Sequence, residues 1–288
     1  MSQDPTKQHH VVVTGASSGI GLSICEFLIA KGFVVYGSVR KNEDAERLTQ
    51  MWGSASFLPL LFDVTDREAV FAGAEQVRAQ IGPRKLYGLV NNAGTVITAP
   101  LAHIRPEDFQ RQIAVNLVGP YHVTQALLPL LGMETTRVGR PGRVVQISSV
   151  SGKIGTPFVG AYTASKHGLE GFSESLRREL YGFGIDVICI GAGAVATPIW
   201  SRTRAIDAAY LQTSYGEALK KFQSYAIQAG PQGLAPENVA KIVFKALTLR
   251  RPKTRYAAVR RRFRNWTVPR HLPKRTMDKA LAKMFGLE

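Results

Sequence analysis

The sequence predicts an α/β fold: one doubly wound, seven-stranded, mostly parallel sheet with helices on both faces. Two observations predict it. Short β-branched runs alternate along the chain with segments of helical length, and this repetition calls for right-handed crossovers between parallel strands. The strand runs are also almost continuously apolar, which is typical of strands buried on both faces of a parallel sheet.

Seven strands are expected in chain order, over Val11–Thr14, Val34–Val39, Phe57–Asp63, Leu86–Asn91, Arg143–Ser148, Asp186–Ile190 and Arg255–Val259. Helices are expected between them, over Ile20–Lys31, Arg67–Ile81, Pro106–Leu131, Tyr162–Tyr181 and Pro236–Leu249. Gly32 follows the first helical segment and Gly82 follows the second, which is where glycine commonly ends a helix.

Length and composition favour a single domain over residues 1–288. The chain is 45% hydrophobic and can bury a full core, and neither a repeat nor a linker divides it. Cys25 and Cys189 lie in apolar runs and form no CxxC pair, so both are expected to be reduced and buried. Because the sequence has neither a signal-peptide layout nor a run of about 18 apolar residues, a cytoplasmic protein is expected.

Two segments interrupt the alternation of strands and helices. Residues 191–235 are long and irregular, so a functional lid is expected, with a packing or interface role as the alternative. The aromatic residues of this segment are Trp200, Tyr210, Tyr215, Phe222 and Tyr225. The second segment, residues 250–288, is strongly basic. From Lys241 to Glu288 the chain has 15 basic and 2 acidic residues, so most of the net charge of +16 lies there.

A glycine-rich turn, Thr14–Gly21, joins the first strand to the first helix. Glycines at such a turn let the backbone approach a pyrophosphate, which the N–H groups of the helix N-terminus hold. The spacing G-x-x-x-G-x-G differs from the common G-x-G-x-x-G fingerprint, so a merely tight turn is the alternative. Its place directly after the first strand favours a dinucleotide site. The candidate residues are Gly15, Ser17, Ser18, Gly19, Ile20 and Gly21.

Tyr162 and Lys166 are four residues apart on an expected helix and therefore share one face. A free phenol has a pKa of about 10, which is poorly matched to proton transfer at neutral pH. A neighbouring ammonium favours the phenolate and lowers that pKa. Such a pair can exchange a proton with an oxygen that is being reduced or oxidised, although the spacing also arises by chance.

Five motifs stand in an order that is typical of one enzyme family. They are Thr14–Gly21, Asn91–Gly94 after the fourth strand, Asn116 in the next helix, Ser149 after the fifth strand, and Tyr162-x-x-x-Lys166. On these motifs, across nearly its whole length, the chain resembles the short-chain dehydrogenase/reductase family. The resemblance implies a Rossmann-fold oxidoreductase that binds a nicotinamide dinucleotide and forms a homodimer or homotetramer.

The resemblance also implies roles for four side chains. Tyr162 is implied to be the general acid/base, and Ser149, thirteen residues earlier, to hydrogen-bond the substrate oxygen. Lys166 is implied to bind the nicotinamide ribose and to tune Tyr162. Asn116 is implied to help hold a water that links Lys166 to solvent. Ser148 is the alternative to Ser149, but its spacing is off by one.

Other positions match the cofactor contacts of the family. Asn92-Ala93-Gly94 follows the fourth strand, and Asp63-Val64 resembles the pair that lines the adenine pocket. After the sixth strand the family usually carries Pro-Gly-x-Val-x-Thr. Val195 and Thr197 match this pattern, whereas Ala192 replaces the proline and removes a restraint on φ.

The end of the second strand bears on the choice between NADP and NAD. NAD-preferring relatives place an acidic residue there to bind the ribose 2′-hydroxyl, whereas this sequence has Val39. Arg40 follows, and a guanidinium suits a 2′-phosphate; Ser18 can add a hydrogen bond. NADP(H) is therefore the expected cofactor and NAD(H) is less favoured, with a solvated Arg40 as the alternative.

The resemblance implies a secondary alcohol/ketone couple as substrate. The stretch Val35–Arg40 and the aromatic lid are similar to the branch that contains 17β-hydroxysteroid and retinol dehydrogenases, which implies a lipophilic, steroid- or retinoid-like substrate. A different class of function is a catalytically silent dinucleotide-binding regulator or scaffold acting through its basic tail. Such a protein is expected to lose Tyr162, Lys166 or Ser149; all three are present, so the enzyme is favoured.

The basic C-terminal segment mixes arginines with aromatic residues over Arg260–Trp266. A solvated basic face is one interpretation. A peripheral membrane contact is another, because basic groups beside Phe263 and Trp266 can seat at an anionic interface. Nucleic-acid binding is not expected, since no recognised module accompanies the charge. No metal site is expected, because no His, Cys and carboxylate cluster has ligand spacing.

Overall fold

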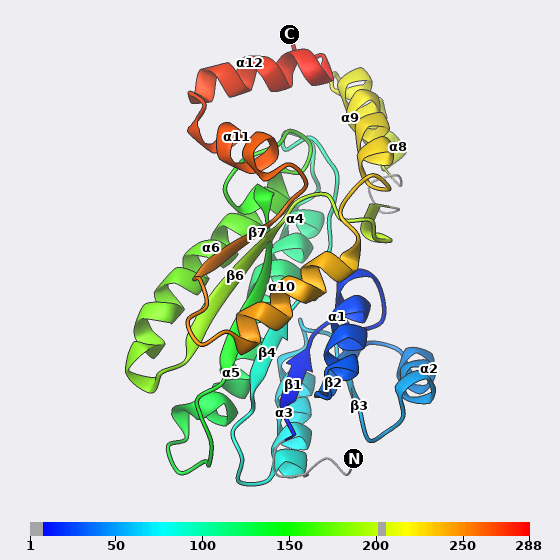
Figure 1. Ribbon diagram of the computed structural model, residues 1–288. Helices are drawn as coiled ribbons and strands as arrows, with labels where there is room; N and C mark the ends of the chain where they lie inside the picture. Colours follow the sequence, from blue (N-terminus) through cyan, green and yellow to red (C-terminus); the bar gives the residue numbers. More distant parts are fainter. Residues whose placement is uncertain (1–7, 201–205) are drawn as a thin grey trace.

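A seven-stranded sheet forms the centre of the computed structural model, which describes residues 8–200 and 206–288 (Figure 1). The strand order is β3-β2-β1-β4-β5-β6-β7, and every neighbouring pair is parallel. The predicted doubly wound α/β fold is therefore confirmed. The strands are β1 His10–Val13, β2 Val34–Val39, β3 Phe57–Leu61, β4 Gly88–Asn91, β5 Arg143–Ser149, β6 Asp186–Ala192 and β7 Arg255–Ala258. Residues 1–7, and residues 201–205 of the predicted lid, lie outside the described residues.

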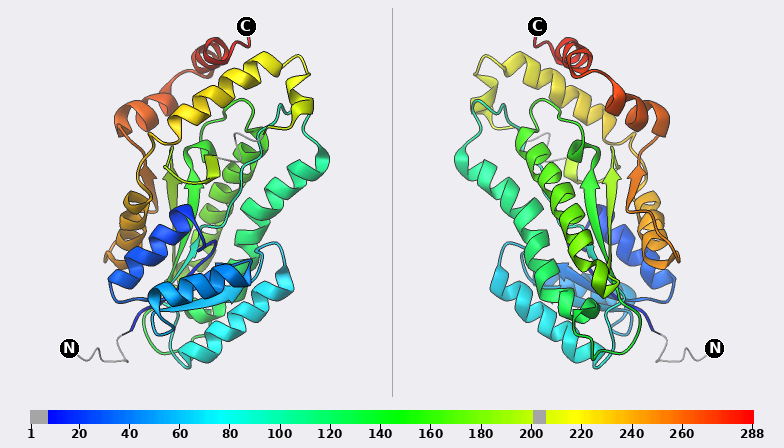
Figure 2. Two further views of the ribbon diagram at one scale, coloured as in Figure 1. Left: turned by 90° about the vertical axis from the view of Figure 1, so that its right-hand side faces the viewer. Right: turned by 90° about the vertical axis from the view of Figure 1, so that its left-hand side faces the viewer.

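The helices are α1 Gly19–Ala30, α2 Asn42–Trp52, α3 Arg67–Ile81, α4 Pro106–Ile113, α5 Gly119–Leu128, α6 Gly160–Glu179, α8 Ala208–Leu211, α9 Gly216–Ala229, α10 Pro236–Thr248, α11 Val268–His271 and α12 Lys274–Phe285. Helices cover both faces of the sheet, whereas α8, α9, α11 and α12 lie beyond the end to which its strands point (Figure 2). α1 and α10 bury Ile24 and Val243 in the core cluster on one face. α3 and α5 bury Val77 and Leu127 in the cluster on the other face, to which α6 also contributes.

The strand order reverses between β1 and β4, because β2 and β3 lie on one side and β5 to β7 on the other. Just past β1, the Thr14 amide donates to the Val90 carbonyl of β4 at 3.0 Å, so the two strand ends stay together. In doubly wound sheets the ligand crevice lies outside the carboxyl ends of the strands at this reversal. The glycine-rich turn follows β1, and the segment from Asn92 follows β4, so the fold brings both to that crevice.

Two helical predictions need correction. The sequence pattern does not predict α2; its buried residue is Leu48, so no apolar stripe marks it. The expected helix over Pro106–Leu131 is helical throughout, but it is not a regular α-helix, because a π-helical turn at Ala114–Val118 lies between α4 and α5. A π-helical turn inserts an extra residue and is frequent at functional sites. This one contains Asn116.

The expectation that residues 191–235 form an irregular loop is also wrong. α8 and α9 occupy much of this segment, and α9 packs against α12 near the C-terminus (Figure 1). The buried residues Ala218, Phe222 and Ala226 of α9 are four residues apart, which is the helical signal in this stretch. The Phe222 and Phe285 rings lie 5.7 Å and 6.4 Å from the Phe158 ring. Much of the segment predicted to be a lid is therefore helical and packs against the C-terminal helix.

Two expectations drawn from composition concern the cysteines and membrane spans. Cys25 and Cys189 are both buried and unpaired, as predicted. Cys25 lies in α1, within the apolar cluster on one face of the sheet, and Cys189 lies in β6. Within residues 8–200 and 206–288, no helix is long and apolar enough to cross a membrane.

Trp266 does not take the exposed position expected of an interfacial residue. It is only 5% exposed, and the guanidinium carbons of Arg255 and Arg270 lie 4.2 Å and 4.6 Å from its ring centroid. Arg255 belongs to β7 and Arg270 to α11. Cation–π contacts of this kind attach the C-terminal segment to the sheet, so the indole is an anchor within the fold. The sequence places Trp266 near several arginines, but it does not show whether the indole faces solvent or the interior of the fold.

Candidate active site

The glycine-rich turn after β1 has the tight shape that a pyrophosphate site requires. Gly15 and Gly19 have φ of +67° and +57°, a region that residues with a Cβ rarely adopt. A Cβ on Gly21 would lie 2.0 Å from the Gly15 carbonyl oxygen, so only glycine fits. Among the described residues, the Ser18 side chain caps no N–H group of α1. The first turn of α1 can therefore offer its N–H groups and partial positive charge to a phosphate.

Residues after β4 hold this turn in place. The Asn92 side-chain amide donates to the carbonyl oxygens of Thr14 and Gly15 at 2.9 Å and 3.2 Å. The backbone amides of Asn92 and Ala93 both donate to the Thr14 hydroxyl at 2.9 Å. The structure thus brings two predicted cofactor segments together. These side chains position the turn, a function that the motif alone does not reveal.

Arg40 and Asp63 lie beside each other past the ends of β2 and β3. Their side chains form an ion pair at 3.6 Å, and the Arg40 side chain is 62% exposed. Burial raises the pKa of the Asp63 carboxyl, but hydrogen bonds from Thr65 and the Arg40 charge outweigh this and hold the pKa below its usual value. Val64 is buried against Gly119. This corner therefore presents an accessible cation next to a carboxylate that stays ionised.

Arg47 is a neighbour of the glycine-rich turn that the sequence does not single out. Its guanidinium donates to the Ser17 carbonyl at 2.9 Å and to Asp44 at 2.8 Å. It comes from α2, the helix that the sequence pattern does not predict. Arg47 and Ser17 are thirty residues apart in the sequence, so their contact cannot be predicted unless the helix that carries Arg47 is predicted first.

Ser149, Tyr162 and Lys166 meet at the carboxyl end of β5. Ser149 ends the strand, and the other two lie in the first turns of α6. The Ser149 hydroxyl lies close enough to Tyr162 to favour its ionised form, which acts to lower the pKa of the phenol. The Lys166 ammonium donates to the Ile147 carbonyl at 2.9 Å and lies 5.8 Å from the Tyr162 ring centroid. By contrast, the buried Ser148 hydroxyl has no partner among the described residues, so the geometry favours Ser149.

The surroundings change the pKa values of two of these groups. Loss of solvent raises the pKa of the Tyr162 hydroxyl, and its hydrogen bond with Ser149 opposes this only in part. Burial lowers the pKa of the Lys166 ammonium to about 8, and the Glu170 carboxylate opposes that shift. The sequence predicts a lowered pKa for the Tyr162 phenol, but the chain alone raises it, because desolvation outweighs the other effects. A further positive charge beside the hydroxyl is needed to lower it.

Asn116 connects the segment after β4 to α6. Its carbonyl oxygen accepts from the Thr95 amide at 2.9 Å, and its amide group donates to the Thr95 carbonyl at 3.0 Å. The same amide group donates to the Ser165 hydroxyl at 3.1 Å. A Cβ on Gly94 would lie 3.5 Å from the Asn116 carbonyl oxygen and 3.9 Å from the Lys166 ammonium. The predicted residues Gly94, Asn116 and Lys166 thus form one group.

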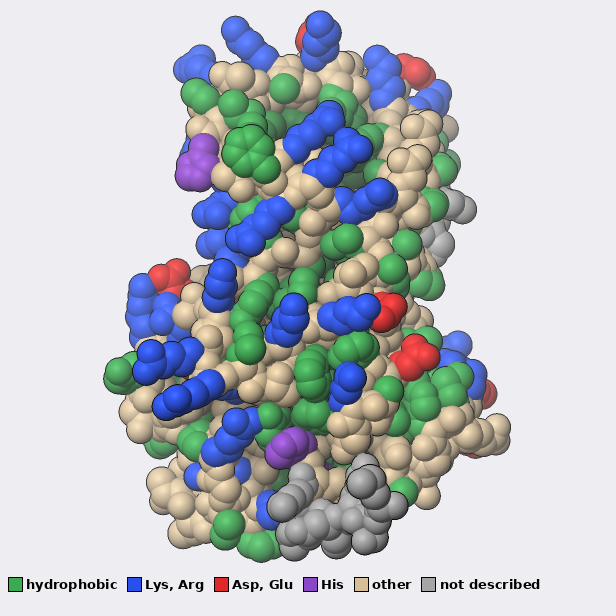
Figure 3. Space-filling view, viewed as in Figure 1, with side chains coloured by type: hydrophobic (Ala, Val, Ile, Leu, Met, Phe, Trp, Pro, Cys, Tyr) green, Lys and Arg blue, Asp and Glu red, His purple; other side chains and the backbone are tan. Residues whose placement is uncertain are grey.

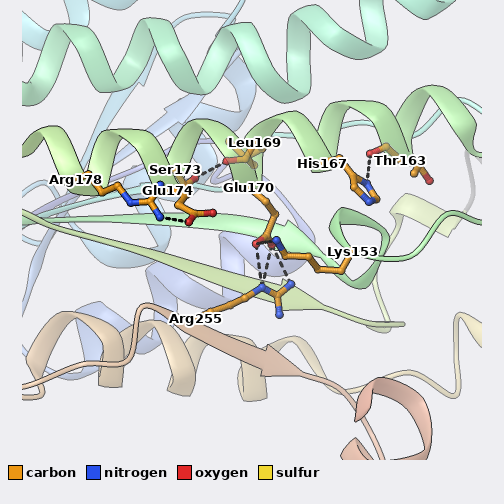
Figure 4. Close-up of polar contacts among 9 residues, drawn as sticks. All are labelled: Lys153, Thr163, His167, Leu169, Glu170, Ser173, Glu174, Arg178 and Arg255. Atoms are coloured by element: carbon orange, nitrogen blue, oxygen red, sulfur yellow. Dashed lines mark hydrogen bonds and ion pairs between the residues drawn. The ribbon is translucent and has the colours of Figure 1, made fainter. Parts of the chain in front are cut away.

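Glu170 is a second residue that the sequence does not single out. It lies one helical turn after Lys166 and is only 6% exposed. Figure 4 shows it reaching from α6 to Arg255 of β7, whose guanidinium donates to both carboxylate oxygens at 2.9 Å and 3.0 Å. Lys153 adds an ion pair at 3.6 Å. A buried carboxylate with two cationic partners therefore lies one helical turn from Lys166.

The run after β6 returns to the glycine-rich turn. A Cβ on Gly19 would lie 3.3 Å from the Thr197 side chain, so Thr197 borders the turn. Val195 pairs with Leu234 in an isolated bridge and accepts a hydrogen bond from the Trp200 indole at 2.7 Å. Ala192, which stands in place of the usual proline, ends β6 and pairs with β7.

An apolar cluster covers Tyr162 on the lid side. Its buried aromatic members are Phe158, Tyr210, Phe222 and Phe285, and Trp200 and Tyr215 pack against it with Tyr162. Of the predicted lid aromatics, Tyr225 is the exception at 50% exposure. A separate groove of about 610 Å³ opens between the start of α6 and α12. Its lining includes neither Ser149 nor Tyr162, so we do not assign the substrate to it.

Comparison with known proteins identifies the family of the chain. Residues 9–207 match the family model described as short chain dehydrogenase. The chain is 36% identical to an NADPH-dependent 3-dehydrocapnine reductase of Ornithobacterium rhinotracheale, over 95% of this chain and 96% of that one. It is 37% identical to retinol dehydrogenase 5 of Mus musculus, over 96% of this chain and 89% of that one.

The fold is similar to that of a short chain dehydrogenase/reductase from Burkholderia phymatum, solved in complex with NAD. The TM-score is 0.78 at 22% identity, and 95% of each chain is covered. At this identity the likeness concerns the fold alone. The family match, by contrast, spans most of the chain, and the two relatives are similar across nearly their whole length. The chain therefore belongs to the short-chain dehydrogenase/reductase family of oxidoreductases.

Proposed function

We propose that the protein is an NADP(H)-dependent oxidoreductase acting on a lipophilic secondary alcohol or ketone. The observation that carries the proposal is the meeting of Ser149, Tyr162 and Lys166 at the end of β5. The reversal point of the sheet, with its glycine cradle, lies at the same edge. The bound nicotinamide would supply or accept the hydride. We assign its binding to the glycine-rich turn, Asn92-Ala93-Gly94, Asp63-Val64, Val195 and Thr197.

Each polar side chain of the group has a distinct proposed role. Tyr162 exchanges the proton of the substrate oxygen, and Ser149 donates a hydrogen bond that holds the same oxygen. Lys166 stays next to the phenol through its hydrogen bond to the Ile147 carbonyl and contacts the ribose. Asn116 positions the strand-end segment against α6 through Thr95 and Ser165. Asn116 also helps to bind a water molecule that links Lys166 to solvent.

The preference for NADP(H) over NAD(H) rests on Arg40. Its exposed guanidinium lies at the corner where the ribose 2′-phosphate of NADP would lie, and no carboxylate follows β2 directly. A charged, planar donor is well suited to a phosphate. The relative from Ornithobacterium rhinotracheale is named as NADPH-dependent, which agrees with this preference, whereas the Burkholderia phymatum structure holds NAD.

A lipophilic substrate is supported by the apolar cluster that packs around Tyr162. Its members include Phe158 before α6, side chains of α8 and α9, and Phe285 of the C-terminal helix, so we expect a largely aromatic approach to the reactive hydroxyl. Such lining suits a steroid- or retinoid-like carbonyl. A silent regulator is not favoured, because Ser149, Tyr162 and Lys166 are all present and brought together.

A substrate screen tests the proposal. Purified protein is incubated with NADPH and, in turn, steroid ketones, retinal, quinones and short β-keto esters, and cofactor oxidation is followed. We expect kcat/KM for the best lipophilic carbonyl to exceed that for the short esters by roughly tenfold or more, since each buried methylene adds binding. A preference for the short esters would contradict the lipophilic assignment.

Glu170→Gln should move the alkaline fall of the reduction rate to lower pH. The pKa of Lys166 is about 8, so its ammonium is present below that pH and is lost as pH rises through it. The variant removes the carboxylate that opposes this lowering, so the charge is lost at lower pH. The measurement is kcat/KM against pH, with Glu174→Gln, an exposed carboxyl of α6, as control. If the alkaline fall of kcat/KM lies at the same pH in Glu170→Gln and in the wild type, Glu170 has only a structural role.

A further inference from the structure

The C-terminal end of the molecule carries a basic surface that the proposed chemistry does not use. We call residues 261–284 the basic cap; they contain eight basic residues and one acidic residue, Asp278. Figure 3 shows Lys and Arg side chains gathered over this end, with hydrophobic side chains between them. All eight basic residues are exposed: Arg261, Arg262, Arg264, Arg270, Lys274, Arg275, Lys279 and Lys283.

Large apolar side chains are exposed among these cations. Phe263 is 74% exposed and Met284 is 54% exposed, and Val268 and Leu272 are exposed to lesser degrees. Exposing the Phe263 ring to water between Arg262 and Arg264 is unfavourable, because apolar surface is stabilised by burial. Exposed apolar groups surrounded by one sign of charge are typical of helices that lie in a membrane interface.

The cap is fixed to the body at two places, so it acts as a rigid surface. Trp266 is buried against Arg255 of β7, which is itself bound to Glu170 on α6. Phe285, which follows the cap on α12, is buried with Phe158 and Phe222 in the cluster over Tyr162. The cap is therefore continuous with the lid (Figure 1).

We propose that the basic cap docks on an anionic membrane surface. Its arginines and lysines meet the phospholipid headgroups, and Phe263 enters the headgroup–acyl boundary. A nucleic acid would complement the charge but would not explain the exposed Phe263, Leu272 and Met284. Docking in this orientation holds the lid at the membrane. The docking itself does not rest on the proposed function. Only the advantage of holding the lid at the membrane, where a lipophilic substrate would be found, rests on it.

Sedimentation with vesicles tests the proposal on the full chain without any substrate. We expect the protein to bind vesicles of phosphatidylcholine mixed with phosphatidylserine, to bind pure phosphatidylcholine far less, and to be released by salt. Each basic residue near such a surface contributes about fivefold in affinity. The triple variant Arg261→Gln, Arg262→Gln, Arg264→Gln should therefore bind about 100-fold more weakly. Arg260 is left in place because its guanidinium donates to the Gln232 carbonyl.

A matched control separates the cap from net charge. Arg250, Arg251 and Lys253 are exposed and precede β7, whereas the cap follows β7, so they lie at the other end of that strand. Changing these three to Gln removes the same charge and should leave vesicle binding near the wild-type level. Equal loss in both triple variants would overturn the proposal. So would absence of binding by the wild type, or wild-type binding that prefers a DNA duplex to the vesicles.

Phe263→Ser tests the apolar part of the surface without changing charge. The side chain is mostly exposed, so the thermal melting temperature should stay near the wild-type value. We expect roughly tenfold weaker binding to the anionic vesicles, because burial of an aromatic ring in the interface is lost. Unchanged binding would show attraction by charge alone and would contradict docking through the interface. An inactive enzyme that still binds vesicles would count against the proposed function and not against docking.

Discussion

Tyr162→Phe is expected to lower kcat by more than the roughly 10²–10⁴-fold usually credited to general acid–base catalysis. The substitution removes one hydroxyl and keeps the ring that packs in the lid cluster. Ser149 remains, but a serine hydroxyl is a poor acid and cannot replace the phenol. The glycine-rich turn and Asn92 lie on other elements, so cofactor binding should change little.

Steady-state kinetics with the best lipophilic carbonyl measures this loss, and the dissociation constant for NADPH serves as the check on the cofactor site. Tyr181→Phe is the matched control, because Tyr181 follows α6 and is 87% exposed. It should keep wild-type turnover. Near wild-type turnover in Tyr162→Phe would show that the proton comes from another group.

Arg40→Asp is expected to shift the cofactor preference from NADP toward NAD. The new carboxylate repels a 2′-phosphate and can accept a hydrogen bond from a free 2′-hydroxyl. Losing one charged hydrogen bond and adding repulsion should cost NADP about 2–4 kcal/mol. The position is exposed and its ion pair with Asp63 is long at 3.6 Å, so the fold should tolerate the change.

The ratio of kcat/KM for the two cofactors measures the shift. Arg40→Gln separates lost attraction from added repulsion: it should weaken NADP use without improving NAD use. If the ratio is the same in wild type and in both variants, Arg40 is a solvated surface residue and the NADP assignment loses its support.

The sheet could be predicted because its strands are buried on both faces. Val11 to Val13 of β1, for example, are fully buried, and such strands appear as continuous apolar runs. The motifs Thr14–Gly21, Asn91–Gly94 and Ser149 could be located for the same reason, since they lie at the ends of these strands. Asn116 and the Tyr162–Lys166 pair lie on helical segments instead, and their order along the chain located them. α2 and α9 were harder because exposed polar residues dominate the first, and scattered aromatics obscure the spacing in the second.

Contacts between distant segments could not be predicted. Arg255 binds Glu170 across 85 residues of sequence, and neither residue belongs to a recognisable motif. Trp266 stands beside arginines in the sequence, and only the fold shows that it is buried against Arg255 and Arg270. The π-helical turn at Asn116 is likewise invisible to a periodicity of 3.6 residues, since one extra residue leaves the pattern almost unchanged.

Transfer of a labelled hydride is the most direct test of the proposed oxidoreductase activity. Purified protein is mixed with a lipophilic ketone and NADPH that carries deuterium at the transferable position of its nicotinamide, with each face labelled in turn. We expect an alcohol whose carbinol carbon has gained deuterium from one face of the cofactor. We also expect far less labelled product with Tyr162→Phe. Wild-type protein that binds NADPH but forms no labelled alcohol from any steroid or retinoid carbonyl would contradict the proposed activity.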